Sequence, residues 1–402
     1  MRTKIFTEEL SEAAEIIRNG GLVAVPTETV YGLAGNGLNE KAVKNIYEVK
    51  GRPAVKPLSL MVPGKEAMKE YCEDVPCQAE KLAEKFWPGP LTIVLKSKAL
   101  VPEIVRAGGT TVGLRCPAHA MTLETLKMAG VPFAAPSANP SGEESPKDAG
   151  KVKEYFDGKI DGIIDGGPCG IGTESTLLDM SAAPYRILRQ GALSKKEIED
   201  ALLSEMLIIG ITGGTGSGKT TALEELEKHG AWKIDCDKVY HALLENSEAM
   251  KDELKKEFPG CISDGKIDRK RLGSIVFGDR EALEKLNRIT HFYVKQEIDR
   301  LLREAAMSGR RLAAIDAIEL FSSGVSAMCR YTVGVIADRE VRIQRIMKRD
   351  NISAEYAASR VDAQKTDAYF RAHCSHILEN NGGQEEFERK CHDLFKEIIE
   401  NE

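Results

Sequence analysis

The sequence predicts an α/β protein built from two domains in tandem. Three observations support this: a length of 402 residues, an alternation of helix-like and strand-like segments, and a pattern that restarts at Met206. At roughly 150 residues per domain, this length suits two or three domains. Hydrophobic residues make up 42% of the chain and charged residues 29%, which is typical of a globular protein.

Composition and charge exclude several classes of protein. The formal net charge of −6 disfavours a globally basic DNA- or RNA-binding protein. The longest apolar runs are far shorter than the ~20 residues of a membrane helix, and the first ten residues lack a secretory apolar stretch. The nine cysteines form no C-x-x-C pair, which favours reduced thiols over a disulfide framework or a cysteine zinc site. We therefore expect a cytoplasmic protein with no membrane or DNA partner.

The first half alternates helices and strands without a regular βαβ order. Residues 8–18 have helical periodicity and stop at Asn19-Gly20-Gly21, and Asn39 is placed to cap a helix that runs to Lys50. Compact apolar runs predict strands at 22–25, Leu91–Lys96, 112–115, 133–135, 160–164 and 175–179. This order predicts a mixed α/β sheet.

The seam between the halves is a polar amphipathic stretch at 194–205, followed by the apolar run that begins at Met206. A complete strand–loop–helix unit starts there, so we expect a fusion boundary near 194–206 and domains at 1–200 and 206–402. The alternative is a single domain with an internal methionine.

The second half opens with a phosphate-binding signature. Strand Leu207–Thr212 leads into a loop that fits G-x-x-x-x-G-K-[ST] and then a helical pattern at 221–229. Glycines let successive backbone N–H groups turn toward phosphate oxygens, and the next helix adds its positive end. Lys219 is expected to reach the β and γ phosphates, and the Thr220 hydroxyl to ligate Mg²⁺. The ATP-binding loop is Gly213, Gly214, Thr215, Gly216, Ser217, Gly218, Lys219 and Thr220.

Two carboxylates follow at the end of a strand expected at 231–234. Asp235 and Asp237 would lie at the carboxyl edge of the sheet, beside the phosphate loop. One could orient Mg²⁺, and the other could accept a proton from an attacking hydroxyl. The alternative is a pair of solvated loop acids.

These segments carry a family resemblance. ITGGTGSGKTT, IDCDKVYHALL and DGKIDRKRLGSIVFGDREALEKLNRITH resemble dephospho-CoA kinase (CoaE) over about 206–400. The resemblance implies a P-loop, nucleoside-kinase-like parallel α/β domain that transfers the ATP γ-phosphoryl to the ribose 3′-hydroxyl of dephospho-CoA. It also implies that Asp237 is the base with Asp235 beside it, and that His241, Arg269 and Asn287 line the acceptor side.

A basic run follows further along the chain: Arg339, Arg342, Arg345, Lys348 and Arg349. On a helix, residues 342, 345 and 349 share one face. The run resembles the family's lid, and Arg345 and Arg349 are expected to offset the charge of the transferring phosphate. A solvated basic face is the alternative for the run as a whole.

Three segments depart from the kinase pattern. The family's proline-leucine-leucine-phenylalanine-glutamate segment is replaced at 318–322, its histidine-proline pair at 291–292, and its alanine-aspartate pair at 374–375. None of these segments lies in the phosphate loop. They therefore do not change the expected ATP binding, and they leave the identity of the acceptor substrate open.

In the first half, polar and cationic residues are scattered, and composition alone favours surface charge over a single anion pocket. Several blocks nevertheless resemble threonylcarbamoyl-AMP synthase of the YrdC/TsaC type over about 5–195, in the family's order. They are PTETVYGLAGN, YEVKGRPAVKPLSL, FWPGPLTIVL, TVGLRCPAH, FAAPSANPSG, GGPCGIGTESTLLD and RILRQGAL.

The resemblance implies synthesis of threonylcarbamoyl-adenylate and pyrophosphate from L-threonine, bicarbonate and ATP, with tRNA reached only through later enzymes. Threonine would be held by Thr29, Arg115, Ser137 and Ser175. The nucleotide would be held by Arg52, Lys56, Thr111, Asn139 and Arg189, with Lys50 as a further catalytic cation. Positioning and electrostatics are expected to drive the reaction, without a covalent enzyme intermediate.

Two departures stand out in this half: Lys147 replaces the family's usual threonine, and the second, smaller domain of longer members is absent. Two alternatives stay open for the whole chain. The first half could be an RNA-binding or ribosome-associated module, and the second half could phosphorylate a different nucleotide or alcohol.

Overall fold

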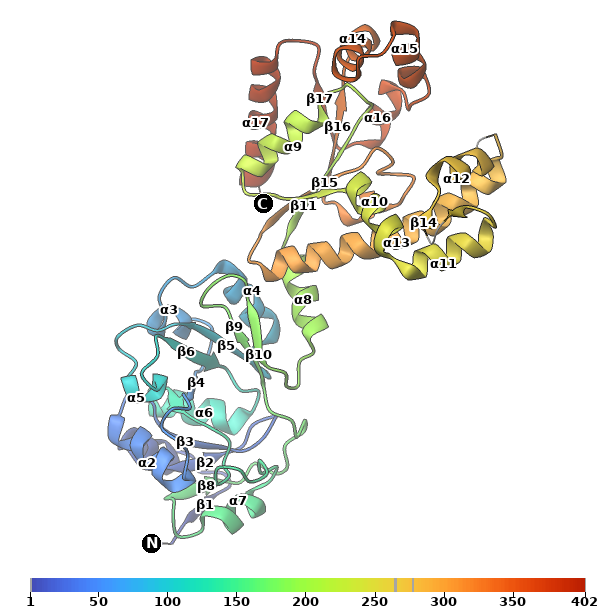
Figure 1. Cartoon of the computed structure of the whole chain (residues 1–402). Helices are drawn as coiled ribbons and strands as arrows, with labels where there is room; N and C mark the ends of the chain where they lie inside the picture. Colours follow the sequence, from blue (N-terminus) through green and yellow to red (C-terminus); the bar gives the residue numbers. More distant parts are fainter. Residues whose placement is uncertain (1, 264–265, 277, 402) are drawn as a thin grey trace. The chain divides into compact units, whose positions relative to one another are not determined.

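The computed structural model describes residues 2–263, 266–276 and 278–401 (Figure 1). It divides into two compact units. The first contains the chain up to Glu205 together with Met307–Gly309, and the second contains Met206–Ala306 and the chain from Arg310 onward. Among the described residues, no helix is both long and apolar enough to cross a bilayer.

The first unit is a mixed α/β sheet, as predicted. Its ten described strands run in the order β1-β8-β2-β3-β7-β4-β6-β5-β9-β10, with parallel and antiparallel neighbours. The strands are β1 (Lys4–Phe6), β2 (Val23–Val25), β3 (Gly32–Asn36), β4 (Ser59–Met61), β5 (Leu91–Lys96), β6 (Thr111–Arg115), β7 (Phe133–Ala134), β8 (Gly162–Ile164), β9 (Thr176–Asp179) and β10 (Arg186–Arg189).

The helices of this unit are α1 (Ser11–Arg18), α2 (Glu40–Lys50), α3 (Ala67–Tyr71), α4 (Cys77–Phe86), α5 (Glu103–Arg106), α6 (Ala120–Ala129), α7 (Ala149–Phe156) and α8 (Lys195–Ser204). Helix α2 starts as predicted, because the Asn39 side chain accepts hydrogen bonds from the backbone N–H groups of Lys41 and Ala42. It ends at Gly51, whose φ of +59° suits glycine. The C-terminus of α2 is thereby fixed beside Arg52.

The second unit is built on a parallel sheet with the order β12-β15-β11-β16-β17. These strands are β11 (Leu207–Thr212), β12 (Trp232–Asp235), β15 (Leu312–Asp316), β16 (Tyr331–Ile336) and β17 (His376–Glu379), and a separate small pair consists of β13 (Ile262–Ser263) and β14 (Lys266–Ile267). The helices are α9 (Lys219–Lys228), α10 (Cys236–Asn246), α11 (Glu248–Glu257), α12 (Arg269–Val276), α13 (Arg280–Met307), α14 (Arg339–Asp350), α15 (Ala354–Asp362), α16 (Asp367–His373) and α17 (Gln384–Glu400).

The main core of the second unit lies between its sheet and helices α9 and α17, which pack side by side (Figure 1). Ile209, Ile211, Leu226 and Phe395 are fully buried there. Because the central strand β11 is anchored on both sides by parallel neighbours, the loop that leaves its carboxyl end at Thr212 has a fixed origin.

Candidate active sites

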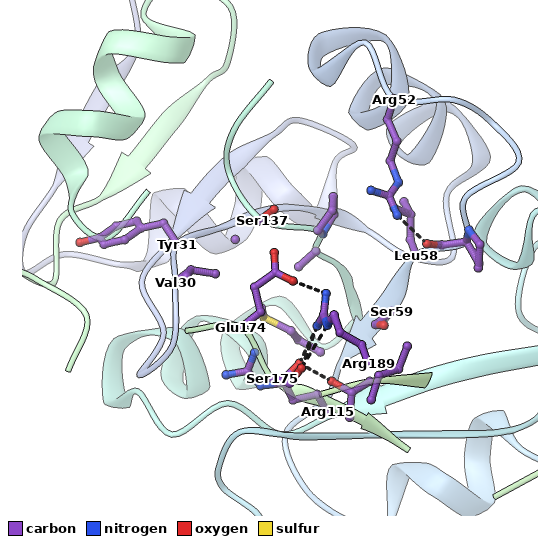
Figure 2. A pocket seen from close by; sticks show the side chains of 17 residues that line it. Val30, Tyr31, Arg52, Leu58, Ser59, Arg115, Ser137, Glu174, Ser175 and Arg189 are labelled. Atoms are coloured by element: carbon purple, nitrogen blue, oxygen red, sulfur yellow. Dashed lines mark hydrogen bonds and ion pairs between the residues drawn. The ribbon is translucent and has the colours of Figure 1, made fainter. Parts of the chain in front are cut away.

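The first unit carries a polar pocket over its sheet, drawn in Figure 2. Its walls come from segments far apart in sequence: the loop before β3, the loop after α2, the end of β6, the loop after β7 and the β9–β10 region. Its polar and charged lining residues include Tyr31, Arg52, Ser59, Thr92, Arg115, Ser137, Glu174, Ser175 and Arg189. Three guanidinium groups thus reach one cavity, which suits an anionic ligand.

Arg115 lies at the carboxyl end of β6, with only 8% of its side chain exposed. Its Nη2 donates to Glu28 Oε1 at 2.7 Å and to Thr29 Oγ1 at 2.8 Å, and its Nε donates to the Gly89 carbonyl at 3.2 Å. Within the described part of the chain, Nη1 makes no hydrogen bond. These contacts fix the guanidinium while leaving donors for a carboxylate ligand.

A second arginine, Arg189, lines the same pocket. Arg189 on β10 donates from Nη2 to the Ser175 carbonyl at 2.9 Å and to Ser175 Oγ at 3.2 Å, and it forms an ion pair with Glu174. The Ser175 hydroxyl also lies 2.8 Å from Thr92 Oγ1. Figure 2 shows Arg115, Glu174, Ser175 and Arg189 grouped on one side of the pocket and Arg52 on the other.

Arg52 enters from the loop after α2. Its Nη2 donates to the Pro57 carbonyl at 3.0 Å and its Nε to the Lys56 carbonyl at 3.3 Å. Burial lowers the pKa of this guanidinium, since a charged group loses hydration there. An anionic ligand would compensate that loss.

Lys50 has a different environment from the one expected of a phosphate-binding cation. Its Nζ donates to the backbone carbonyls of Ser137 and Asn139, and the residue is almost fully buried. Burial, with the nearby Arg52 charge, lowers the pKa of Lys50 to about 8. The contacts hold the 137–139 loop against α2, so Lys50 positions Ser137 rather than lining the pocket.

The remaining residues expected in this site lie at various distances from the pocket. Thr29 is fully buried behind it and binds Arg115, whereas Lys56 is exposed outside the lining. Thr111 begins β6, so about 13 Å of strand separates it from Arg115. Asn139 donates to the Glu143 carbonyl at 2.7 Å, and its Oδ1 is buried without a partner among the described residues.

Two glutamates of this site were not predicted from the sequence. Glu28 binds Arg115 and also accepts from the Ala118 N–H at 2.8 Å, and Glu174 pairs with Arg189. Both lie within segments that resemble the synthase family, next to Thr29 and Ser175, and this position was the available signal. The departure at Lys147 lies on the surface, with its amine 3.9 Å from Glu144.

The second unit carries the phosphate loop between β11 and α9. Gly218 has a φ of +109°, and a Cβ there would collide with Asn380 Nδ2. Gly218 is the N-cap of helix α9, which begins at Lys219, two residues before the predicted start. Lys219 Nζ donates to the Gly213 carbonyl at 3.0 Å, and the Ser217 hydroxyl is buried without a partner among the described residues.

The cavity at this loop contains most of the expected ATP-binding residues. Its lining is Gly214, Thr215, Gly216, Gly218, Lys219, Thr220, Asp237, Ile318, Arg345, Arg349 and Arg360. A neighbouring cavity is lined by Cys236, Asp237, Tyr240, Leu286, Asn287, Thr290, His291, Val294, Ala317, Ile318, Glu319, Ser323 and Val325. Asp237 and Ile318 line both, so the Asp237 carboxylate stands where the two cavities meet.

The two predicted acids have different local roles. Asp235 is the N-cap of α10: its side chain accepts from the Lys238 N–H at 3.1 Å, and it lies 3.4 Å from Lys238 Nζ. Asp237 is in the first turn of the same helix and faces the cavities.

A third acid, Asp316, was missed from the sequence. It ends β15, in register with Ile211 of β11 and Asp235 of β12, and its Oδ1 is buried without a hydrogen bond among the described residues. Burial raises its pKa to about 6, against the opposing charge of Lys219. The signal was the run LAAID, an apolar strand that ends in a carboxylate.

The basic run forms helix α14, and its arginines lie in three environments. Arg339 is exposed and pairs with Asp362 at 2.8 Å. Arg342 is buried and donates to the Thr215 carbonyl at 3.0 Å and to Gln364 Oε1 at 2.6 Å, so it braces the phosphate loop. Arg345 and Arg349 line the cavity; Arg345 donates to Asn380 Oδ1 at 3.1 Å, and Arg349 pairs with Asp350 at 2.7 Å.

The acceptor-side residues lie in two places. Asn287 belongs to the cavity next to Asp237, whereas His241 and Arg269 line a further cavity with Glu245, Asn246 and Ile267. Two of the segments that depart from the family pattern also line the cavity that contains Asn287, through His291 and through Ile318 and Glu319. The third packs elsewhere: Ser375 Oγ accepts from the Thr332 N–H at 2.9 Å.

Comparison with known proteins assigns each half of the chain to a family. A Sua5/YciO/YrdC family model described as "Telomere recombination" matches residues 15–191, and one described as dephospho-CoA kinase (CoaE) matches 207–386. Threonylcarbamoyl-AMP synthase of Pyrococcus abyssi is 36% identical over 325 residues, which cover 81% of this chain and 91% of that protein.

Two further relatives are similar to one half each. Threonylcarbamoyl-AMP synthase of Bacillus subtilis is 44% identical over 193 residues, 48% of this chain and 56% of that protein. Dephospho-CoA kinase of Dehalococcoides mccartyi is 35% identical over 197 residues, 48% of this chain and 99% of that protein. The chain therefore belongs to the threonylcarbamoyl-AMP synthase family through its first half and to the dephospho-CoA kinase family through its second, as a fusion of two ATP-using enzymes.

Proposed function

We propose that the chain catalyses two separate reactions at two separate ATP sites. The first unit forms L-threonylcarbamoyladenylate, pyrophosphate and water from L-threonine, bicarbonate and ATP. The second phosphorylates the ribose 3′-hydroxyl of dephospho-CoA with ATP, giving CoA and ADP. The observation that carries this proposal is that each unit has its own anion-binding cavity, one built from guanidinium groups and one from a glycine loop with Lys219.

In the synthase, Arg115 is the group that would bind the threonine carboxylate. Its orientation is set by Glu28, Thr29 and Gly89, and its Nη1 is available to donate to the carboxylate. The hydroxyl groups of Ser137 and Ser175 line the same pocket and would orient the rest of the amino acid.

Arg52 and Arg189 would bind the nucleotide's phosphates in the same pocket. Their charge would stabilise the negative charge that develops as pyrophosphate leaves. Catalysis would come from positioning the carbamate oxygen against the α-phosphorus, without an enzyme-bound intermediate. The product would reach tRNA only through later transfer enzymes.

In the kinase, Asp237 is placed to accept the proton of the attacking 3′-hydroxyl, because it lines both the phosphate cavity and the neighbouring acceptor cavity. Lys219 would bind the β and γ phosphates, and Arg345 and Arg349 would offset charge on the transferring group.

The donor set beside the phosphate loop fits Mg²⁺. Thr220 supplies a hydroxyl, and Asp316 supplies a buried carboxylate whose Oδ1 has no partner among the described residues. Oxygen donors of this kind suit Mg²⁺, which would neutralise phosphate charge when it binds with ATP. Burial raises the pKa of Asp316, and a bound cation would favour its charged form.

We further propose domains at 1–200 and 206–402 and a reducing compartment such as the cytoplasm. Glu205 and Met206 divide the two compact units, and all nine cysteines are free thiols.

The test is product identification with purified full-length chain, ATP and Mg²⁺. With dephospho-CoA, mass spectrometry should show CoA and ADP. With threonine and bicarbonate, it should show threonylcarbamoyl-adenylate and pyrophosphate. Failure of either reaction with its own substrates would contradict that half of the proposal.

A different kinase acceptor is the second candidate, because Ile318 and Glu319 alter the wall of the cavity beside Asp237. It would be favoured if other nucleotides or small alcohols were phosphorylated with a higher kcat/KM than dephospho-CoA.

A further inference from the structure

A cluster of nitrogen and oxygen donors lies in the second unit, away from the phosphate loop. Glu225 lies on α9, His229 is the residue that follows this helix, and His392 lies on α17. Helices α9 and α17 pack side by side (Figure 1), and the cluster lies where the end of α9 meets α17. No role in ATP or acceptor binding involves these residues.

The donor atoms are spaced as a metal ion requires. Glu225 Oε1 lies 2.9 Å from His392 Nδ1 and 3.7 Å from His229 Nε2, and one ligand atom from each residue lies within 4.8 Å of the others. A tetrahedral ion with bonds of about 2.0–2.1 Å holds its ligand atoms about 3.4 Å apart. The two measured separations lie on either side of that value.

A bound ion would replace one hydrogen bond of the cluster, the 2.9 Å contact between His392 Nδ1 and Glu225 Oε1. Glu225 has 6% of its side chain exposed, and its other oxygen, Oε2, accepts from Lys228 Nζ at 2.8 Å. This leaves Oε1 facing the two imidazole rings. His229 Nε2 is buried without a hydrogen-bond partner among the described residues. A buried polar nitrogen without a partner is unfavourable, and a bound cation would satisfy it.

Solvent can reach the cluster through His392, half of whose side chain is exposed. The rings of His229 and His392 lie nearly parallel, 5.3 Å apart. An ion could therefore enter from the His392 side and complete its coordination with water.

We propose that Glu225, His229 and His392 form a transition-metal site of the Zn²⁺ class. Two imidazole nitrogens and one carboxylate oxygen suit Zn²⁺ and its neighbours, whereas Mg²⁺ prefers oxygen donors. With a rise of about 1.5 Å per residue, Glu225 lies roughly 9 Å and His229 roughly 15 Å along α9 from Lys219, so the site is distinct from the Mg²⁺ position proposed for the kinase. The bound ion would crosslink α9 to α17.

The simpler alternative is an ion pair between Glu225 and His392 that joins the two helices. That pair does not use His229, so loss of the His229 ring separates the two models. His229→Gln would weaken metal binding if the site exists, and it would leave an ion pair between Glu225 and His392 unaffected.

The experiment uses full-length, tag-free protein treated with a chelator and titrated with Co²⁺, and then with Zn²⁺, in excess Mg²⁺. We expect one Co²⁺ per chain with the intense visible absorption of a tetrahedral ion, displaced by Zn²⁺. Zn²⁺ should also raise the unfolding temperature of the wild-type protein.

His229→Gln and His392→Ala should each weaken Co²⁺ binding by at least about tenfold. His373→Ala, which removes an exposed histidine outside the cluster, should leave it unchanged. Circular dichroism checks folding, and the half-exposed position of His392 makes its variant the safer one. Absence of saturable binding would overturn the proposal, as would binding that His229→Gln and His392→Ala both leave intact.

Discussion

Asp235 and Asp316 are register partners at the carboxyl ends of the adjacent parallel strands β12 and β15. Asp235 caps helix α10, while the buried Oδ1 of Asp316 has no partner among the described residues. The two acids at this sheet edge thus have separate tasks: one sets the start of the helix that presents Asp237, and the other faces the phosphate loop and Lys219.

Asp316→Asn is expected to lower the kinase kcat by about 100-fold or more while the synthase rate stays unchanged, because a neutral amide replaces the carboxylate proposed to bind Mg²⁺. Measuring both activities in the same preparation checks this. If the variant had the wild-type kinase kcat, Asp316 would not be a ligand of Mg²⁺.

The same substitution should stabilise the second unit in the absence of ligand. The folded-state pKa of Asp316 is about 6, against an ordinary value of 3.8. The folded state therefore binds more protons between those values, and the free energy of unfolding falls as pH rises from about 4 to about 6. Asn carries no such penalty, so Asp316→Asn should gain on the order of 3 kcal/mol above pH ~6 and little near pH ~4.

This gain can be measured by urea unfolding in a Trp87→Phe background, where Trp232 is the sole tryptophan and reports on the second unit. Equal stability of the Asp316→Asn variant and its parent protein at both pH values would contradict the shifted pKa.

The Asp237→Asn variant tests whether Asp237 is the general base of the kinase reaction. We expect kcat for dephospho-CoA phosphorylation to fall by roughly 10²–10⁴ with the KM for ATP little changed, since a base acts on the hydroxyl and not on nucleotide binding. Asp235→Asn is the matched control and should cost less, because an asparagine N-cap still accepts the Lys238 N–H bond. An equal loss in both variants would argue against the assignment of Asp237.

Arg115→Lys tests the synthase pocket. Lysine keeps the charge opposite Glu28 but cannot make the contacts to Glu28, Thr29 and Gly89 and also donate to a carboxylate, so the KM for threonine should rise at least about tenfold. Steady-state pyrophosphate release at varied threonine measures it. The kinase of the same protein is the internal control, and its rate should not change.

Lys50 is expected to make the free energy of unfolding of the first unit depend on pH. Its folded-state pKa of about 8 lies below the ordinary 10.5, so the folded state binds fewer protons between those values and the free energy of unfolding rises with pH there. Lys50→Met should reduce that slope by up to about 1.4 kcal/mol per pH unit. Unfolding in a Trp232→Phe background, with Trp87 as the probe, measures it; an unchanged slope would contradict the burial of a titrating amine.

The sequence predicted the second unit's phosphate loop because its residues are contiguous and their spacing is dictated by the anion they surround. Asp316 was harder to find, since a single acid after an apolar strand becomes meaningful only when sheet order puts β15 beside β11.

The first unit shows the opposite case. Arg52, Arg115 and Arg189 come from separate parts of the chain, and local sequence could not distinguish a shared pocket from scattered surface charge. Tertiary structure brings these three together and leaves Thr111 and Lys56 outside the lining. The pairing of Arg115 with Glu28 also depends on tertiary contacts that periodicity does not encode.

The most direct test of two independent ATP sites is the binding stoichiometry of a non-hydrolysable ATP analogue, measured by equilibrium dialysis at saturation. The account predicts two analogue molecules per wild-type chain, with one lost in Lys219→Ala and the other lost in a variant carrying Arg52→Ala and Arg189→Ala. A single bound analogue per wild-type chain, or loss of both in either variant, would contradict it.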